Sequence, residues 1–217
     1  MLETAQAHYI RNVMRMKQGD FLRLFNGRDG EWLASVTDHG KTQSSVLLKG
    51  KTREQSPKPS EMHLLFAPIK KDGMDFIIEK AVELGVTDLH PVLTNRTEVR
   101  KINEERLKVQ SHEAAEQCER LDVLTLHPLV DLKSKLAGWR GTPILWCRER
   151  GESPHINTIN EKAWAFLIGP EGGFDDAEFA FLGGMINVKP VTLGETVLRA
   201  ETAVVISLGY AKILAGK

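Results

Sequence analysis

The sequence predicts an α/β fold, with a parallel sheet covered by helices, behind a small β-rich unit. Three observations predict it. Short strand-like runs separated by turn dipeptides fill the region from Gly19 to Gly50. The stretch Lys51–Ser60 is polar, holds two prolines and lacks apolar periodicity, which is typical of a linker. Beyond it, strand-like apolar runs alternate with helix-like stretches, as in sheets covered by helices.

The β-rich unit is expected to hold three strands. Asn26-Gly27 and Asp29-Gly30 are the turn dipeptides between them. The strand-like runs are 20–27, 31–38 and 44–50. They predict a small β-barrel or sheet, and the linker puts the domain boundary at about residue 60. The two expected domains are therefore 1–60 and 61–217.

In the second domain the expected strands are 62–67, 86–93, 143–147 and 163–168. One helix is expected to begin with Asp72 as its N-cap, to repeat apolar residues at helical spacing, and to end at Gly85. Another is expected from about Asn103 to Glu119, and a last one follows Arg199.

Composition indicates an ordinary globular protein. Hydrophobic residues make up 41% and charged residues 27%, which excludes disordered and fibrous classes. No apolar run reaches membrane-spanning length and no signal peptide is visible, so a soluble, cytoplasmic protein is expected. Cys118 and Cys147 lack the paired spacing of a zinc or redox motif, so both are expected to be reduced thiols, and no metal is expected.

The charge is unevenly distributed along the chain although its formal net value is zero. Residues 1–60 hold 10 Lys and Arg against 6 Asp and Glu, while the remainder holds 19 against 23. A basic first domain fits a platform that contacts phosphates. On charge alone, ordinary variation of a protein surface explains the imbalance equally well.

The most informative stretch is AWAFLIGPEGGFDDAEF, residues 163–179. An apolar strand runs into Gly169–Gly173, and Asp175 and Asp176 then open a helix. Glycines between a strand and a helix let the backbone approach a ligand closely. The spacing is neither that of a dinucleotide fingerprint nor that of a P-loop. A tight turn without a ligand is the alternative.

A second stretch, VTLGETVLRAETAVVISLGYAKIL, covers residues 191–214. An expected strand ends at Leu193-Gly194, and a short turn leads through Leu198-Arg199 into an apolar helix. Taken alone, Arg199 and Glu201 fit an ion pair at the first turn of a helix, where a carboxylate complements the helix dipole.

Together the two stretches resemble the closing motifs of the ribosomal RNA small subunit methyltransferase E family, of the SPOUT class. LIGPEGGFDDAE looks like its Gly-Pro-Glu-Gly-Gly loop, and LGETVLRAETA like its Leu-Gly-x-x-x-Leu-Arg-x-Glu-Thr-Ala segment. Residues 79–99 and 113–123 are similar to its middle motifs and residues 8–20 to its N-terminal one. The resemblance thus covers nearly the whole chain in the family's order.

The resemblance implies a PUA-like β-barrel at about residues 1–60, followed by a SPOUT methyltransferase domain with a C-terminal trefoil knot. Such knots are rare, and neither composition nor periodicity indicates one. The knot loops of that class bind S-adenosylmethionine in a bent form, and two subunits complete each active site, which implies a homodimer. The family's barrel usually has a further strand before the equivalent of His8, so an N-terminally incomplete barrel is expected in this chain.

Carried over position by position, the resemblance gives a cofactor site built mostly from backbone atoms, with Leu198 as apolar cover for adenine. Glycine turns beside apolar side chains suit an adenine ring. The expected cofactor-binding residues are Leu167, Ile168, Gly169, Pro170, Glu171, Gly172, Gly173, Leu193, Gly194, Val197, Leu198 and Arg199.

The family methylates N3 of a uridine, a weak acid whose proton must leave and whose charge must be stabilised. Arginines suit the second task, and Arg96, Arg120 and Arg199 are the candidates. Glu116, four residues before Arg120 on one helical face, is expected to orient Arg120 or to accept a proton. A solvent-facing helical ion pair is the alternative for these two.

Near the N-terminus, cations recur at near-helical spacing beside an aromatic ring. The expected RNA-binding residues are His8, Tyr9, Arg11, Arg15 and Lys17. Cations contact phosphates and a tyrosine stacks on a base. A solvated helix face is the alternative.

The sequence as a whole therefore predicts a uridine N3-methyltransferase of 16S ribosomal RNA, acting on the RNA or on the small ribosomal subunit. Displacement at a sulfonium methyl needs no Lewis acid. Two alternatives stay open. In the first, the chain is a related SPOUT enzyme that acts on another RNA or on a ribose 2′-hydroxyl. In the second, it is an RNA-binding or assembly protein that has the fold but does not catalyse methyl transfer.

Overall fold

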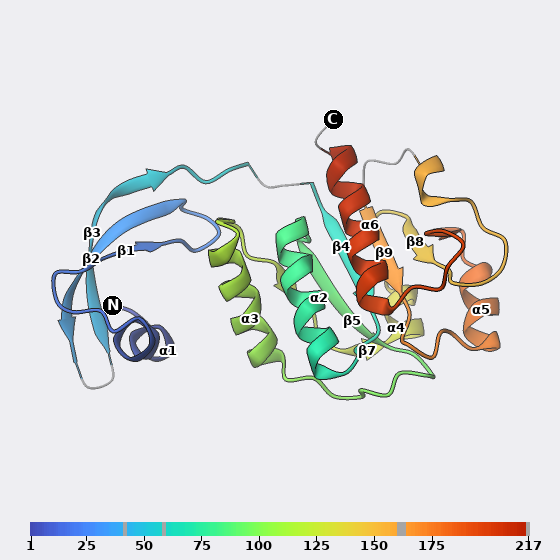
Figure 1. Cartoon of the computed structure of the whole chain (residues 1–217), viewed down its shortest axis with the longest axis horizontal. Coiled ribbons are helices and arrows are strands. Elements are labelled where there is room, and N and C mark those ends of the chain that lie inside the picture. The colour runs from blue at the N-terminus through green and yellow to red at the C-terminus, as the bar shows by residue number, and fades with distance from the viewer. Residues whose placement is uncertain (41–42, 58–59, 160–163, 216–217) are drawn as a thin grey trace. The chain divides into compact units, whose positions relative to one another are not determined.

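The computed structural model describes residues 1–40, 43–57, 60–159 and 164–215 (Figure 1). The chain divides into two compact units, Met1–Lys58 and Pro59–Lys217. The first unit has helix α1 (Thr4–His8), a π-helical turn (Tyr9–Val13) and strands β1 (Phe21–Leu24), β2 (Glu31–His39) and β3 (Ser44–Arg53). The strands pair antiparallel in the order β1-β2-β3, so the three predicted strands form a small sheet.

The core of the first unit is small, and Ile10, Leu22, Ala34 and Val36 are its buried members. The predicted linker starts too early, because β3 continues through Arg53. Glu31, which is almost buried, accepts a hydrogen bond from Thr52 Oγ1 at 2.7 Å and extends the ladder to that point. Residues 58 and 59 of the predicted linker lie outside the described residues.

The second unit is built on a parallel sheet of order β10-β8-β9-β4-β5-β6, with β7 also paired to β5. Its strands are β4 (Met62–Phe66), β5 (Asp88–Leu93), β6 (Thr125–Leu126), β7 (Val130–Asp131), β8 (Ile144–Cys147), β9 (Trp164–Ile168) and β10 (Val188–Val191). The four apolar runs predicted as strands are confirmed as β4, β5, β8 and β9; Ala163 of the last run lies outside the described residues. The strand expected to end at Leu193-Gly194 ends two residues earlier, at Val191.

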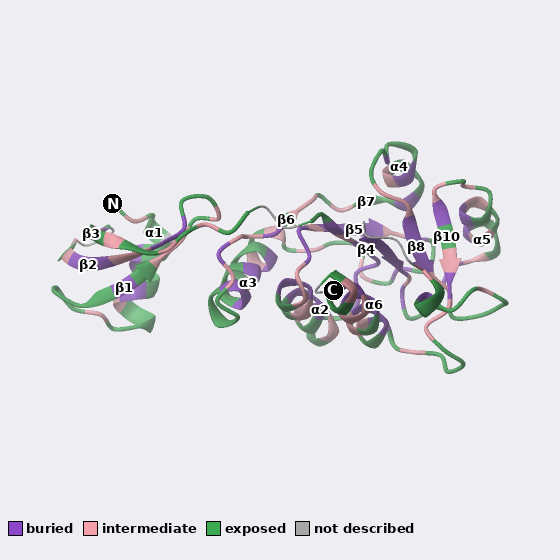
Figure 2. Cartoon of the chain, turned by 90° about the horizontal axis from the view of Figure 1, so that it is seen from above, coloured by how far each residue is buried: buried purple, intermediate pink, exposed green. Residues whose placement is uncertain are grey.

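Helices cover both faces of this sheet (Figure 2). One face carries α2 (Lys71–Leu84), α3 (Glu104–Gln117) and α6 (Ala200–Ala215), and the other α4 (Leu132–Ala137) and α5 (Asp176–Gly183). A cluster containing Leu136, Trp146, Leu167 and Leu182 fills the second face. The predicted α/β architecture is thus confirmed, and both faces are buried as parallel sheets require.

Helix ends follow local sequence, with one correction. Lys70, rather than Asp72, is the N-cap of α2, and Asp72 lies in the first turn, where its charge complements the helix dipole. Gly85 ends that helix at φ 98°, a left-handed conformation that glycine adopts without strain. Asn103 caps α3 by accepting a hydrogen bond from the amide of Arg106. None of the helices in the described ranges is long and apolar enough to cross a membrane.

Candidate functional site

A cavity of about 240 Å³ lies at the carboxyl ends of β8, β9 and β10. Ligands of open parallel sheets bind at this edge. The volume is slightly below the roughly 300–1,000 Å³ of common ligand pockets. The cavity is lined by Cys147, Arg148, Glu149, Ile168, Gly169, Pro170, Glu171, Gly173, Phe174, Phe179, Leu193, Gly194, Thr196, Val197, Leu198, Arg199, Ala200 and Ala203.

The loop after β9 forms one wall, and two of its positions require glycine. A Cβ on Gly169 would lie 2.7 Å from the Phe174 ring. Gly173 has φ +66°, and a Cβ there would meet the carboxylate of Glu149. Because side chains are excluded at both positions, backbone atoms form this part of the cavity wall.

The glycine loop is held by residues that follow β5. Asn95 donates its amide to Glu178 Oε1 at 2.8 Å and its Nδ2 to Asp175 Oδ2 at 2.6 Å. Asp175 and Glu178 cap α5 reciprocally, and Glu178 is buried. The pKa of Asp175 is lowered, first by the amide of Glu178 and then by Asn95. The loop therefore has a fixed anchor on the neighbouring part of the sheet edge.

A smaller hollow of about 50 Å³ adjoins the cavity and shares Pro170 and Glu171 with it. Arg96 lines this hollow and donates from Nη1 to the carbonyl of Gly172 at 3.0 Å. Its guanidinium is thereby held at the rim of the cavity.

The opposite wall of the cavity is the loop from β10 to α6. Thr192 Oγ1 donates to the carbonyl of Gly194 at 2.9 Å, in a tight turn with Gly194 at φ 135°. Val197 is 59% exposed, so its side chain is available to cover a bound ring. Arg199 is exposed where α6 begins and lines the cavity.

Eight of the lining residues were not predicted from the sequence, and Cys147 and Arg148 are the most informative of them. The guanidinium of Arg148 lies 5.2 Å from the centroids of both Trp146 and Phe179, and its buried Nε has no hydrogen-bond partner among the described residues. Cys147 contacts Ser207 Oγ at 3.3 Å, and burial raises the pKa of its thiol to about 12. The position of Cys147 and Arg148 could have identified them from the sequence, because they lie at the carboxyl end of β8 and ligands bind at that edge of a parallel sheet.

Ten of the twelve residues predicted to bind the cofactor line the cavity. Leu167 does not, because it is fully buried within β9, and Gly172 lines the smaller hollow instead.

Of the predicted catalytic residues, Arg199 lines the cavity and Arg96 lines the smaller hollow beside it. Glu116 and Arg120 of the same chain line neither of these hollows. Arg120 donates to the carbonyls of Val82 and Val86 at the opposite edge of the sheet, and to Asp122 at 2.7 Å. The predicted pairing of Glu116 with Arg120 is wrong, because these partners occupy the guanidinium. Glu116 is exposed, and partial desolvation and the charge of Glu113 raise its pKa.

The predicted RNA-binding residues do not share one helix, because helical structure ends at Val13. Arg15 follows in a left-handed conformation at φ 54°, and Lys17 lies in the loop before β1. Arg11 donates to the carbonyl of Gly40 at 2.8 Å. The remaining four predicted residues, His8, Tyr9, Arg15 and Lys17, are exposed.

Comparison with known proteins matches both units. Residues 56–212 match the family described as RNA methyltransferase domain, and residues 2–49 the family described as RNA methyltransferase PUA domain. The ribosomal RNA small subunit methyltransferase E of Rickettsia conorii is 35% identical over 95% of this chain and 86% of its own.

Two solved structures are similar over 98% of this chain and 90% of theirs. A Legionella pneumophila protein, solved with the bound cofactor SAM, is 30% identical with a TM-score of 0.84. A ribosomal RNA small subunit methyltransferase E of Neisseria gonorrhoeae, bound to S-adenosyl methionine, is 27% identical with a TM-score of 0.83.

Proposed function

The chain belongs to the ribosomal RNA small subunit methyltransferase E family, and on that premise we propose that it methylates N3 of a uridine in 16S ribosomal RNA with S-adenosylmethionine. The observation that carries the proposal is the cavity formed by the two loops of the family's closing motifs. The threading of α6 into the trefoil knot of SPOUT enzymes is part of the proposal.

The cavity has the chemistry that this cofactor needs. Ile168, Leu193 and Leu198 give apolar walls for adenine, and the backbone exposed at Gly169 and Gly194 gives polar atoms beside them. The unpartnered Nε of Arg148 is a buried donor suited to the carboxylate of the cofactor's methionine part. The residues present therefore fit the cofactor.

When bound, S-adenosylmethionine would supply a methyl group to a nucleophile, and the bond from the methyl carbon to sulfur would break as the neutral thioether leaves. The chain must position the uridine ring at the cavity mouth, remove the proton of N3 and stabilise the resulting negative charge. In this proposal Arg199, which lines the cavity, and Arg96, which lines the adjoining hollow, stabilise charge on the carbonyl oxygens of the ring. Glu171 lines both hollows, and its carboxylate is the proton acceptor in this proposal.

We further propose that the first unit contacts the RNA. Exposed His8, Arg15 and Lys17 supply cations for phosphates, and Tyr9, 37% exposed, supplies a stacking surface. The place of action is then the cytoplasm, where the small subunit is assembled.

A homodimer is also part of the proposal. On the side of α2 and α6, Phe76, Ile206 and Ile213 are 40%, 38% and 67% exposed. Exposed apolar side chains on packed helices support an interface between two copies. Sedimentation velocity measures the mass directly, and a monomer at micromolar concentration would contradict the dimer.

The deciding experiment transfers labelled methyl from S-adenosylmethionine to small ribosomal subunits that lack the native modification, followed by digestion of the RNA to nucleosides. Label recovered as 3-methyluridine supports the proposal. Label in a 2′-O-methylated nucleoside would keep the fold and change the acceptor. Cofactor binding without transfer to subunits or to naked 16S RNA would favour an RNA-binding or assembly protein.

A further inference from the structure

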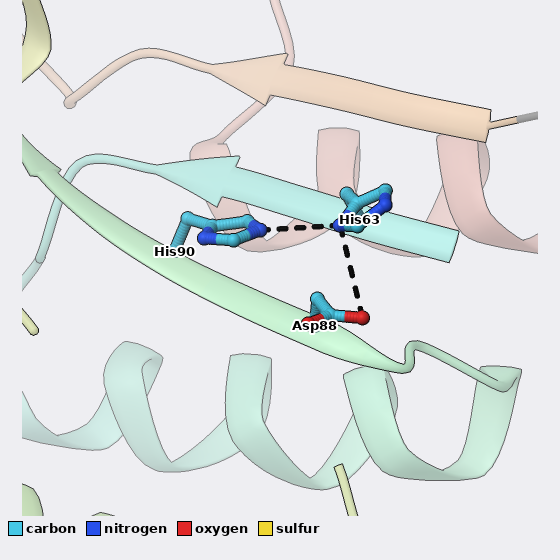
Figure 3. A group of neighbouring side chains, drawn as sticks. All are labelled: His63, Asp88 and His90. Carbon is cyan, nitrogen blue, oxygen red and sulfur yellow. Dashed lines mark hydrogen bonds and ion pairs between the residues drawn. The ribbon is translucent and has the colours of Figure 1, made fainter. Parts of the chain in front are cut away.

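Away from the cofactor cavity, a group of metal-ligating side chains stands on the central strands of the sheet (Figure 3). His63 of β4 lies opposite Asp88 of β5 in the parallel register, and His90 lies two residues further along β5. Residues two apart on a strand point to the same face, so all three side chains gather on one side of the sheet.

Their donor atoms lie at distances suited to one ion. His63 Nδ1 is 3.2 Å from His90 Nε2 and 3.8 Å from Asp88 Oδ2, and the three atoms all lie within 4.8 Å of one another. Ligands placed tetrahedrally around zinc at about 2.0–2.1 Å are separated from each other by roughly 3.4 Å. Binding would bring the three atoms to about that spacing.

Further groups orient these side chains from outside. His63 Nε2 faces Glu61 Oε2 at 3.6 Å, and Asp88 Oδ1 is 2.9 Å from His127 Nε2. Carboxylates behind ligand histidines and hydrogen bonds to ligand carboxylates are the usual supports of a metal site. Lys135 is a cation near the group, and Asp88 is the carboxylate of the ligand set that opposes its charge.

The two imidazoles already face each other through ring nitrogens. In the metal-free chain the two rings share one N–H···N hydrogen bond, which an ion would replace.

We propose that His63, Asp88 and His90 bind one divalent transition-metal ion, with zinc as the expected occupant. Two imidazoles and one carboxylate are a zinc ligand set, and water completes it. The side chains of His63 and Asp88 are 12% and 22% exposed, which gives the ion a path from solvent.

The role of this site is structural. It joins β4 to β5 at the strand ends opposite to the cavity, so it takes no part in methyl transfer. The sequence showed no sign of this group, because His63 lies 27 residues before His90 and no short spacing motif connects them.

The test is titration of chelator-treated, full-length protein with zinc chloride by calorimetry, and with cobalt chloride by visible absorption. One equivalent is expected to bind, with the intense visible bands of tetrahedral cobalt. His63→Gln and Asp88→Asn should each weaken zinc binding at least 100-fold, and His127→Ala by about 10-fold, since supporting residues contribute that much. His112→Ala, exposed on α3, is the matched control and should bind like the wild type.

Circular dichroism and S-adenosylmethionine binding report whether each variant is folded. Failure of the wild type to bind one equivalent would overturn the proposal, and so would undiminished binding by folded His63→Gln and Asp88→Asn. If a variant does not fold, the wild-type cobalt spectrum decides, because an octahedral spectrum or none contradicts the site.

Discussion

At the residue scale, Arg199 is the cationic side chain that links the cavity to the start of α6. Arg199→Ala should lower methyl transfer about 10²- to 10³-fold, the usual effect of removing one group that stabilises developing charge. S-adenosylmethionine affinity, measured by calorimetry, should change less than about tenfold. Arg140→Ala, on the loop before β8, is the control, and full activity of Arg199→Ala would remove Arg199 from the site.

The two cysteines differ in reactivity by their surroundings. Cys118 is exposed, whereas burial raises the pKa of Cys147 to about 12, so almost no Cys147 thiolate exists at pH 8. In the native protein, Cys118 should therefore react rapidly with Ellman's reagent, and Cys147 should react at least about 100-fold more slowly. Rapid reaction of both thiols in the native protein, or of the one remaining thiol in Cys118→Ser, would contradict the low reactivity of Cys147.

At the scale of elements, the anchor between the β5 loop and α5 depends on Glu178. Glu178→Ala leaves the amides of Asn95 and Asp175 without their carboxylate, which should lower the free energy of unfolding by about 3 kcal/mol. Urea denaturation measures this. Asp176→Ala, exposed in the same helical turn, should cost less than about 1 kcal/mol. Equal effects would show that the anchor is unimportant.

The glycine loop tests the shape of the cavity wall. Gly173→Ala introduces a side chain at φ +66° against Glu149, so the loop must move and S-adenosylmethionine affinity should fall at least about tenfold. Gly183→Ala is the control, because nothing lies within 4 Å of its added Cβ at the end of α5. Unchanged affinity in Gly173→Ala would mean that the cofactor does not depend on this wall.

Elements were predictable where the signal is local. Apolar runs predicted β4, β5, β8 and β9, and Gly85 predicted a helix end, because burial on both faces and a left-handed cap leave marks in neighbouring residues. The two-residue strands β6 and β7 and the helix α4 are too short to show a period. The extension of β3 through Arg53 depends on Glu31, far away in sequence, and so was missed.

At the scale of the whole molecule, the site exists only because the sheet brings distant ends together. The two loops that the motifs identify are joined in the cavity by Cys147 and Arg148, which no motif marks. Arg120 belongs to one of the family's motifs, and yet it donates hydrogen bonds to the backbone carbonyls of Val82 and Val86, away from the cavity. A motif specifies which residue type occupies a position, whereas the order of the strands in the sheet decides which positions lie close together in space.

The division into two units predicts separate tasks. Every residue that lines the cavity lies in Pro59–Lys217, so a chain of residues 60–217 should bind S-adenosylmethionine within about threefold of the full chain. Methyl transfer by the same chain to small subunits should fall at least about 100-fold if, as we propose, phosphate contacts by the first unit supply RNA affinity. Calorimetry and the nucleoside assay measure the two effects. Full transfer by the shorter chain would show that the RNA is held by the methyltransferase unit alone, and lost cofactor binding would show that the units fold as one.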